Sequence, residues 1–426
     1  MSESPNQAEV LIVGGGLIGL CSAHYLHEAG YRVRVLERRE AVGLETSFAN
    51  SGMVTPSMSD PWNAPGVHRT ILKYLGRAEA PMLLRPGAIG HYLGWGLKFL
   101  RHSAPARFEP AMRANFKLSA YSLQRLQALR TSLGLEYEHR SAGTLKVFRD
   151  QAGMDQALAD CEKLQQFGLR YRLLDRAAAL ALEPVLAGNA GSIVGALQFP
   201  DDETGDAQLF CQQLQRSLAA RGVQFSFNDD VQRLQIDNGA IRALHSSSGV
   251  HACSKLVVAA AGWSPKLLAG SGVRVWIKPV KGYSVTVPLE DASLMPGRSI
   301  IDNEMHAAVT PLARRLRLAG TAEFAGWNPH LDPARIQNLW NMLECVNPAL
   351  AQAVDRQAAR NWCGFRPMSA DGNPYIGATH IRGLFLNTGH GYLGWTQSAG
   401  SGALLAQQII GAEPEIDDQP YRVARG

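Results

Sequence analysis

Three glycines near the N-terminus have the spacing that a phosphate-binding turn requires. Gly14, Gly16 and Gly19 follow an apolar run, residues 8–13, and precede residues 17–29, whose apolar side chains recur at helical intervals. In a strand–turn–helix unit of this kind, the first glycine makes the tight turn and the second lets the backbone approach a pyrophosphate. The third lets the helix pack closely on the strand. The spacing therefore predicts a nucleotide site at this turn.

The start of the expected helix and an acid further along complete this nucleotide site. Leu17 and Ile18 open the helix, where free N–H groups and a partial positive charge favour phosphates. Glu37 closes a second apolar strand, which contains Val33 and Val35. Its carboxylate can accept hydrogen bonds from ribose hydroxyls and disfavours a 2′-phosphate. A glycine-rich packing turn would account for the glycines but not for Glu37, so we predict a bound dinucleotide.

Three further regions of the sequence favour FAD over NAD as that dinucleotide. The segment after Glu37 is a loop of small and hydroxyl-bearing residues, suited to lie against phosphates and a flat ring. Residues 384–386 form an apolar strand that leads through a glycine-rich turn into a long helix, whose N-terminus could stabilise negative charge on a flavin. A third strand and turn is "KLVVAAAGWSP". The predicted cofactor contacts in these regions are Arg38, Thr46, Ser47, Asn50, Ser51, Gly52, Met53, Gly262, Gly389, Gly391, Tyr392, Leu393 and Gly394.

The composition is typical of a globular protein with a substantial core. The chain has 426 residues, 46% of them hydrophobic and 19% charged, a length that suggests two domains. The net charge of +5 is spread along the chain without a Lys/Arg block, which argues against nucleic-acid binding. The six cysteines form no CxxC pair, so we expect reduced thiols and no metal site. The N-terminus lacks the basic start of a secretory signal, and we expect a cytoplasmic protein.

Several longer segments resemble the FAD-dependent D-amino acid dehydrogenases, within the wider group that includes glycine and sarcosine oxidases. These segments are "LETSFANSGMVTP", "PWNAPGV", "QFPDDETGDAQLF", "VKGYSVTVP", "GFRPMSADGNPYIG" and "LNTGHGYLGWTQSAGSG". The resemblance implies FAD as cofactor and oxidative deamination of D-amino acids to 2-oxo acids and ammonia, by hydride transfer to flavin N5. It implies electron transfer to a quinone or another acceptor that is not oxygen. It also implies that the backbone of Val231 meets the adenine.

The resemblance leaves the substrate open within one class of enzyme. Small neutral D-amino acids such as D-alanine are the expected substrates. The alternatives are a cyclic or secondary amine (D-proline, 4-hydroxy-D-proline, glycine or sarcosine), or a flavin-binding subunit of a larger dehydrogenase.

An enzyme of this kind must hold a carboxylate, and Arg366 is the candidate for that task. A guanidinium matches a carboxylate bidentately, and related oxidases use the arginine at this motif position. The alternative is a structural pair with a nearby acid such as Asp371. Tyr283 could donate its hydroxyl to the same carboxylate, or it is an ordinary strand tyrosine. The carbonyl of Gly391 could accept a hydrogen bond from the substrate amine, and His390 is either a neighbour of the flavin or a loop histidine.

These pieces alternate along the chain, which predicts two discontinuous domains. Residues 1–60, 205–271 and 361–426 are expected to form an α/β, Rossmann-like FAD-binding domain. Residues 61–204 and 272–360 are expected to form a substrate-binding domain on a mixed or antiparallel β-sheet, as in the glycine oxidase and D-amino acid oxidase group.

Two helices are expected in the intervening segments. Leucines recurring at helical intervals predict one helix over residues 116–133. Residues 87–102, "GAIGHYLGWGLKFLRH", place apolar side chains beside Lys98, Arg101 and His102. This segment is too short to span a bilayer but could lie in the membrane interface, on the cytoplasmic face, and bring the reduced cofactor to a quinone. The alternative is a helix packed on the domain surface.

Overall fold

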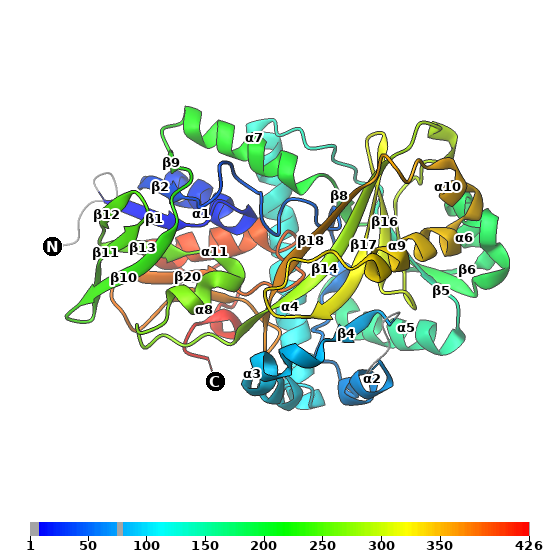
Figure 1. The fold of residues 1–426 in the computed structure, drawn as a ribbon, viewed down its shortest axis with the longest axis horizontal. Helices are drawn as coiled ribbons and strands as arrows, with labels where there is room; N and C mark the ends of the chain where they lie inside the picture. Colours follow the sequence, from blue (N-terminus) through cyan, green and yellow to red (C-terminus); the bar gives the residue numbers. More distant parts are fainter. Residues whose placement is uncertain (1–7, 75–79, 426) are drawn as a thin grey trace.

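The computed structural model describes residues 8–74 and 80–425, which form two large β-sheets with a long helix, α4 (Pro105–Leu133), between them (Figure 1). Residues 1–7, 75–79 and 426 lie outside the described residues. The first of these ranges belongs to the N-terminal segment that was expected to lack a secretory signal, and all three belong to the expected domain ranges. Within the described ranges, no helix combines the length and apolar character needed to cross a membrane.

The first sheet has six strands in the order β19-β20-β13-β1-β2-β9. Its neighbours run parallel except for the edge strand β19, which is antiparallel to β20. Strands buried on both faces are apolar throughout, which explains why the run 8–13 reads as a parallel strand. The strands are β1 (Glu9–Val13), β2 (Arg32–Leu36), β9 (Gln224–Ser226), β13 (Lys255–Val258), β19 (Tyr375–Ala378) and β20 (Leu384–Thr388).

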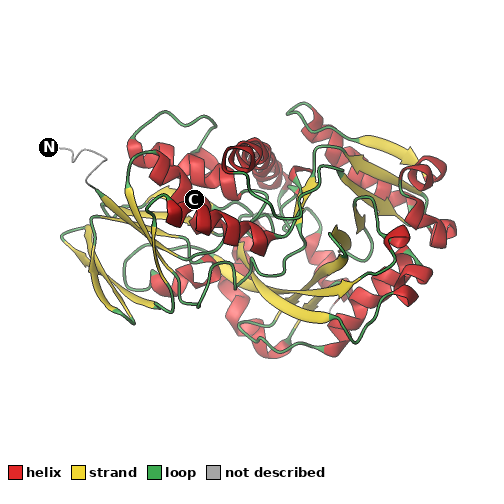
Figure 2. Ribbon diagram, turned by 90° about the horizontal axis from the view of Figure 1, so that it is seen from above, coloured by secondary structure: helices red, strands yellow, loops and turns green. Residues whose placement is uncertain are grey.

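Successive residues of β1 enter different apolar clusters on the two faces of this sheet. Val10 and Ile12 pack with helices on one face, whereas Leu11 and Val13 pack on the other, against a three-stranded sheet (Figure 2). The helices are α1 (Leu17–Glu28), α4, α7 (Ala207–Ala220) and α11 (Ser398–Ile410). The opposite face is covered by β10 (Val231–Asp237), β11 (Ala240–Ser246), β12 (Gly249–Ala252) and the short α8 (Ser264–Leu267).

The second sheet has nine strands and is mixed. Most neighbours are antiparallel, but β15 pairs with β5, and β17 with β4, in parallel. Along the sheet the strands are β18 (Arg360–Ser369), β14 (Ile277–Pro288), β17 (Arg315–Phe324), β16 (Ala307–Leu312), β15 (Ser299–Asp302), β5 (Thr144–Phe148), β7 (Gly195–Phe199) and β6 (Arg172–Asp175), with β4 (Met82–Leu84) beside β17. A mixed second sheet was expected from the sequence, and this part of the fold prediction is confirmed.

Further helices surround the second sheet. Helix α9 (Pro333–Val346) packs on it through Leu339 and Leu343, in a cluster that also holds Leu350. The others are α2 (Val67–Tyr74), α3 (Ile89–Arg101), α5 (Gln151–Gln165), α6 (Arg176–Leu182) and α10 (Pro348–Ala353). The short strands β3 (Met53–Val54) and β8 (Glu203–Thr204) pair with each other antiparallel.

Two boundaries differ from the sequence expectations. The helix expected over 116–133 begins at Pro105, because its first turns bury Phe108 and Met112 in a second apolar cluster that the leucine pattern does not reveal. Residues 361–369, expected within the cofactor domain, belong to β18, which pairs with β14 along its length. The chain re-enters the six-stranded sheet only at β19. The division into domains stays a prediction.

Glycines let α11 lie very close to its neighbouring helices. A Cβ atom on Gly402 would lie 2.7 Å from the carbonyl carbon of Cys21 in α1, and one on Gly400 would lie 2.7 Å from the Cβ of Ser122 in α4. Both distances are shorter than van der Waals contact allows. The position of α1, and with it the glycine turn before it, therefore depends on these two small residues.

We expect Gly402→Ala to destabilise the protein by roughly 1–3 kcal/mol, because the added methyl group forces α1 and α11 apart. Thermal denaturation of the cofactor-loaded protein measures this effect. The matched control is Gly96→Ala in α3, where the structure places no atom within 4 Å of the new Cβ. That substitution should leave the free energy of unfolding unchanged or raise it by up to about 1 kcal/mol, so Tm should not fall. Equal effects of the two substitutions would contradict the close packing.

Candidate active site

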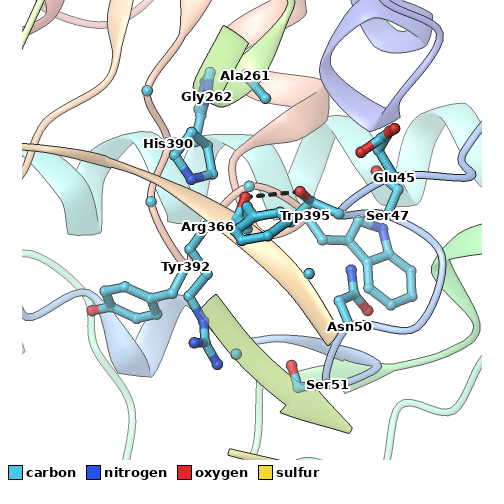
Figure 3. A pocket seen from close by; sticks show the side chains of 18 of the residues that line it. Glu45, Ser47, Asn50, Ser51, Ala261, Gly262, Arg366, His390, Tyr392 and Trp395 are labelled. Carbon is cyan, nitrogen blue, oxygen red and sulfur yellow. Dashed lines mark hydrogen bonds between the residues drawn. The ribbon is translucent and has the colours of Figure 1, made fainter. Parts of the chain in front are cut away.

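A cavity of about 1080 Å³ is lined by residues of both large sheets (Figure 3). Val13 and Leu36 line it from the first sheet, and Gly282 and Thr321 from the second. Most residues that the sequence singled out lie in this wall. They are Gly14, Gly16, Leu17, Ile18, Glu37, Arg38, Thr46, Ser47, Asn50, Ser51, Met53, Val231, Gly262, Tyr283, Arg366, Gly389, His390, Gly391, Tyr392 and Gly394.

Three residues predicted to contact the cofactor lie behind the cavity wall instead. A Cβ atom on Gly19 would collide with the carbonyl oxygen of Gly14. Gly52 has a φ of +73°, and a Cβ there would lie 3.0 Å from the carbonyl oxygen of Gly205. Leu393 is only 3% exposed. Close backbone packing of the turns accounts for the two glycines, and burial accounts for the leucine.

The glycine turn leaves the N-terminus of α1 open towards the cavity. Gly14 has a φ of +111°, and a Cβ there would lie 2.6 Å from the carbonyl oxygen of Ala259. Gly16 is the N-cap and provides no side-chain cap. The N–H group of Leu17 has a long hydrogen bond, 3.4 Å, to Ser47 Oγ. A helix N-terminus without a strong cap, facing a cavity, suits the pyrophosphate of a dinucleotide.

Glu37 fixes the same turn through its carboxylate. Its Oε2 accepts a hydrogen bond from the N–H of Gly15 at 2.6 Å, and its Oε1 accepts one from the N–H of Arg39 at 2.9 Å. Burial raises the pKa of Glu37, although both amide bonds favour its ionised form. Each oxygen keeps a further lone pair, so the carboxylate can still accept from ribose hydroxyls. The amide bonds were not foreseen from the sequence.

An aromatic stack extends from the loop after Glu37. The guanidinium of Arg38 lies 4.2 Å from the centre of the Trp263 ring, and Trp263 stacks on Trp327 with ring centres 4.0 Å apart. Thr46 in this loop donates through Oγ1 to the carbonyl oxygen of Phe365 at 2.9 Å. Sequence reasoning missed Trp327, because it belongs to a connection after β17 that contains no recognisable motif.

Arg366 extends from β18 to the cavity without an acidic partner. Its Nη1 donates to the carbonyl oxygen of Thr321 at 2.9 Å, and its guanidinium lies 5.4 Å from the centre of the Trp62 ring. No ion pair forms between Arg366 and an acid among residues 8–74 and 80–425. Part of its surface faces the cavity, but the surrounding protein removes much of its water, and this burial together with the charge of neighbouring Arg335 lowers its pKa to about 10.

The alternative partner for Arg366 is already engaged. Asp371 forms an ion pair with Arg425, whose Nε lies 2.9 Å from Asp371 Oδ2. Burial raises the pKa of Asp371, but Arg425 outweighs this effect and holds it below the ordinary value. Arg366 therefore presents a desolvated positive charge to the cavity. A Cβ atom on Gly282 would overlap its guanidinium, so glycine is needed beneath it.

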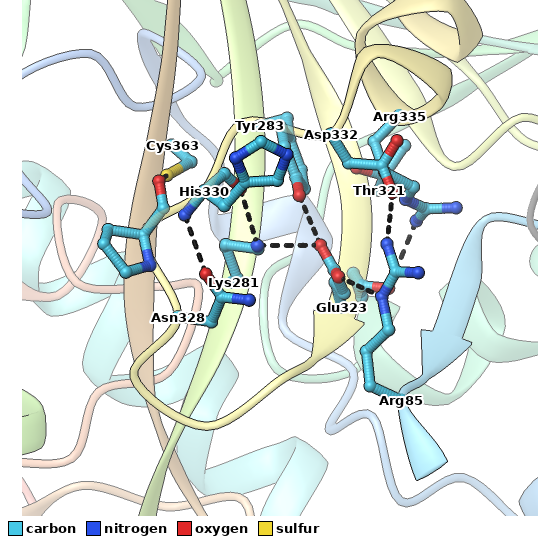
Figure 4. A network of polar contacts seen from close by, with 12 residues as sticks. Arg85, Lys281, Tyr283, Thr321, Glu323, Asn328, His330, Asp332, Arg335 and Cys363 are labelled. Atoms are coloured by element: carbon cyan, nitrogen blue, oxygen red, sulfur yellow. Dashed lines mark hydrogen bonds and ion pairs between the residues drawn. The ribbon is translucent and has the colours of Figure 1, made fainter. Parts of the chain in front are cut away.

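The hydroxyl of Tyr283 is held by an acid of the protein. It donates to Glu323, which also pairs with Lys281 at 3.0 Å and with Arg85 at 2.6 Å (Figure 4). Burial raises the pKa of Glu323, but the hydrogen bonds from these partners outweigh it and keep that pKa below the ordinary value. The ring of Tyr283 packs in the apolar core of the second sheet. This geometry favours the strand-tyrosine alternative, because the hydroxyl proton is already donated.

The C-terminal turn contributes backbone groups and one buried histidine. Gly391 has a φ of +58°, and its N–H donates to the carbonyl oxygen of Pro367 at 3.0 Å. His390 is 5% exposed, and its Nε2 is without a hydrogen-bond partner in the described part of the chain. Burial lowers its pKa to about 3, so its imidazole is neutral at physiological pH. Tyr392 donates to the carbonyl oxygen of Met58 at 2.8 Å.

Comparison with known proteins identifies the family. Residues 9–408 match the FAD dependent oxidoreductases. The chain belongs to this family. It is 40% identical to the D-amino acid dehydrogenase of Bradyrhizobium diazoefficiens over 417 residues, and this alignment covers 98% of each chain. Among solved structures, glycine oxidase from Geobacillus kaustophilus has a TM-score of 0.78 at 22% identity, over 99% of this chain and 100% of that one. L-proline dehydrogenase from P. horikoshii has a TM-score of 0.78 at 17% identity, over 99% and 98%.

This FAD-dependent oxidoreductase is thus an enzyme with FAD as its cofactor, as the sequence predicted. Its fold is the one shared by glycine oxidase and related flavoenzymes, which confirms the fold class. The cavity fits such a cofactor in three respects. The N-terminus of α1 is open to the cavity. Glu37 lines the cavity beside the glycine turn, and the turn at Gly389 lines it as well.

We expect Glu37→Ala to weaken FAD binding by about tenfold to a hundredfold, because two backbone amides lose a charged acceptor, at roughly 1.5–3 kcal/mol for one such bond. Flavin absorbance per chain after dialysis measures retained FAD. The control is Glu40→Ala, which removes the same charge from an exposed position three residues along. Full FAD retention in Glu37→Ala, at the level of the control, would contradict the role of this carboxylate.

Proposed function

We propose that this FAD-dependent oxidoreductase oxidises small neutral D-amino acids, such as D-alanine, to imino acids that hydrolyse to 2-oxo acids and ammonia. Electrons then pass to a quinone or another acceptor that is not oxygen. The observation that supports this proposal most directly is Arg366, a desolvated guanidinium that lines the cavity and forms no ion pair with an acid of the described residues. The relative named D-amino acid dehydrogenase, which is 40% identical over nearly the full length of both chains, agrees with it.

The chain's own groups suffice to bind and orient an amino acid. The planar guanidinium of Arg366 can hold the substrate carboxylate through two parallel hydrogen bonds, and Gly282 leaves room for it to lie flat. The carbonyl of Gly391, at the edge of the cavity, can accept a hydrogen bond from the neutral amine. The neutral imidazole of His390 adds a polar group without adding charge. FAD, when bound, supplies the hydride acceptor for the substrate Cα–H bond.

The fold by itself does not decide which enantiomer or amine is oxidised. Structures of this fold include enzymes named for glycine and for L-proline, and these share no more than 24% identity with this chain. The preference for D-amino acids therefore rests on the closer sequence relative, and a direct comparison of substrates is the test.

We expect D-alanine to bleach the flavin of the wild-type protein under anaerobic conditions, while L-alanine does not. Arg366→Ala should keep its FAD but lose about 3–5 kcal/mol of transition-state stabilisation, seen as a fall in kcat/KM of a hundredfold or more. Arg360→Ala, at the exposed start of the same strand, removes the same charge and is the control. Normal kinetics in Arg366→Ala would show that another residue binds the carboxylate.

The same spectroscopic assay separates the remaining substrate classes. Bleaching by D-proline, 4-hydroxy-D-proline, glycine or sarcosine in place of D-alanine would indicate a cyclic or secondary amine dehydrogenase. A flavin that no amine bleaches would indicate a binding subunit of a larger dehydrogenase.

Helix α3 presents an apolar ridge to solvent, which we propose contacts the surface of an anionic lipid bilayer, where a quinone would be reached. Its inward side chains, Tyr92, Trp95 and Phe99, are buried, so they cannot enter a membrane as the sequence alone allowed. The outward ones are exposed. They are Ile89 at 43%, Leu93 at 62%, Leu97 at 72% and Leu100 at 39%.

Charge on α2 and α3 agrees with a contact to anionic lipid. Leu72 of α2 is 69% exposed, and Figure 1 shows both α2 and α3 along the lower edge of the molecule. The two helices contain basic residues but no Asp or Glu. Exposed apolar side chains beside positive charge are typical of peripheral membrane contact.

We expect the double substitution Leu93→Ser and Leu97→Ser to reduce sedimentation with anionic vesicles by about tenfold or more, because two exposed leucines no longer enter the lipid. Leu173→Ser with Val250→Ser, which removes two apolar side chains that are 51% and 63% exposed elsewhere, is the control. Unchanged vesicle binding in the α3 variant would contradict the proposed contact.

A further inference from the structure

A second, smaller cavity adjoins the main one. Its volume is about 220 Å³, and it is lined by residues of α5 and of the nine-stranded sheet, such as Gln156 and Phe199. Four residues line both cavities, namely Met58, Asp60, Lys146 and Asn303. Two of them carry opposite charges, so the place where the two cavities meet is polar.

Strand β5 directs Lys146 to this place. Its neighbours Leu145 and Val147 are buried in the apolar cluster on one face of the sheet. Because side chains alternate along a strand, Lys146 points from the opposite face. Ile301, which lies opposite Lys146 in β15, lines the main cavity as well. The alternation and the pairing together place Lys146 at the cavity wall.

Asp60 is held at the same place through its backbone. Its carbonyl oxygen and that of Met58 accept hydrogen bonds from the hydroxyl of Tyr392. The ring of Tyr392 stacks on that of Trp62 with ring centres 5.5 Å apart, and the centre of the Trp62 ring lies 5.4 Å from the guanidinium of Arg366. Two residues of chain span at most about 7 Å, so Asp60 and Arg366 belong to the same part of the cavity.

The charged groups of Asp60 and Lys146 have no partner in the described part of the chain. Neither forms a hydrogen bond or an ion pair there, and neither belongs to the fully enclosed polar atoms that lack a partner. Both side chains are half-buried, so their charged atoms remain accessible from the cavities that they line. They can therefore contact a ligand that enters.

Both groups are charged at the pH at which the enzyme is assayed. Burial raises the pKa of Asp60 to about 6, and the nearby charge of Lys146 acts in the opposite direction. At pH 8 the carboxyl group of Asp60 is therefore ionised, and it faces the same space as an ammonium group.

The other titratable groups nearby add no net charge. Asp302 pairs with Arg149 at 2.8 Å, and Asp160 pairs with Lys163 at 3.0 Å. Burial lowers the pKa of His306, which also lines the main cavity, so its imidazole is neutral. One negative and one positive charge therefore remain for a ligand.

This pair of charges selects among the possible ends of a side chain. An ammonium group is attracted by Asp60 but repelled by Lys146, and a carboxylate is attracted by Lys146 but repelled by Asp60. A carboxamide has no net charge. Its NH₂ group can donate to Asp60 while its oxygen accepts from Lys146, so it satisfies both groups at once.

We propose that Asp60 and Lys146 form a binding site for the terminal carboxamide of a D-amino acid, such as D-glutamine, whose α-carboxylate Arg366 holds. This inference rests on the proposed function, which supplies the D-amino acid and the role of Arg366. It names neutral amino acids with a polar end as a substrate class of the same cavity.

The test compares ratios of kcat/KM, so that a general loss of activity cancels. D-glutamate and D-ornithine match D-glutamine in length but end in a carboxylate and in an ammonium group. We expect kcat/KM of the wild-type enzyme at pH 8 to be about tenfold or more higher for D-glutamine than for either, because each brings a like charge against one wall of the site.

Two substitutions should shift this preference in opposite directions. Lys146→Met removes the positive charge, so the ratio of D-ornithine to D-glutamine should rise about tenfold or more. Asp60→Asn removes the negative charge, so the ratio of D-glutamate to D-glutamine should rise by a similar factor. The controls, Lys117→Met and Asp155→Asn, remove the same charges from exposed positions that line neither cavity, and both ratios should stay at the wild-type values.

Stability distinguishes this role from a structural one. If Asp60 and Lys146 serve only to stabilise the fold, Lys146→Met and Asp60→Asn will both lower Tm and leave the two ratios at the wild-type values. That result would overturn the proposal.

The assay also separates failure of this inference from failure of the proposed function. If D-alanine bleaches the flavin but neither ratio shifts in the variants, only this inference fails. If D-alanine does not bleach wild-type flavin, the proposed function fails, and calorimetric Kd values for D-glutamine, D-glutamate and D-ornithine then test the site. Opposite shifts of Kd in the two variants would still support it, and equal Kd values would overturn it.

Discussion

A positive charge kept away from water without an opposite charge beside it is costly, and proteins normally remove that cost by pairing it. Arg366 is such a charge. Its surroundings depress its pKa, and Asp371, the nearest acid in the sequence, is paired with Arg425. Glycine opposite its guanidinium and the carbonyl of Thr321 hold it in place. An anionic ligand beside the guanidinium would offset this cost. Such a ligand can reach Arg366 through the cavity that it lines.

The rest of the fold brings two kinds of chemistry to that cavity. The six-stranded sheet supplies the glycine turn, Glu37 and the open end of α1, and close contacts through Gly400 and Gly402 fix the helices behind them. The nine-stranded sheet supplies the carboxylate-binding side. There Lys281 and Tyr283 of β14 bind the buried carboxylate of Glu323 in β17 (Figure 4). These contacts join the two strands beside the shift in register at Thr321. In the proposed function, the glycine turn of the six-stranded sheet would hold the cofactor, and Arg366 of the nine-stranded sheet would hold the substrate carboxylate.

Features encoded by local sequence could be predicted, whereas features that depend on strand register could not. The glycine turn and the flanking strands are local, because short-range spacing determines turn, strand and helix. Arg366 was found through a motif, but its lack of an acidic partner depends on Arg425 reaching Asp371 across the fold. The sequence left open whether the hydroxyl of Tyr283 binds the substrate or belongs to an ordinary strand tyrosine. It donates to Glu323, because the register of β14 against β17 places that acid beside it. The shift in register at Thr321 and the stack of Trp327 on Trp263 likewise arise only from tertiary pairing.

A crystal structure of the FAD-loaded enzyme with bound pyruvate is the most direct test of the central claim, that Arg366 is a carboxylate site left unpaired for the substrate. The account predicts both carboxylate oxygens of pyruvate within about 3 Å of the guanidinium nitrogens of Arg366, in parallel geometry. Pyruvate bound elsewhere in the cavity, with Arg366 turned towards an acid of the protein, would contradict it.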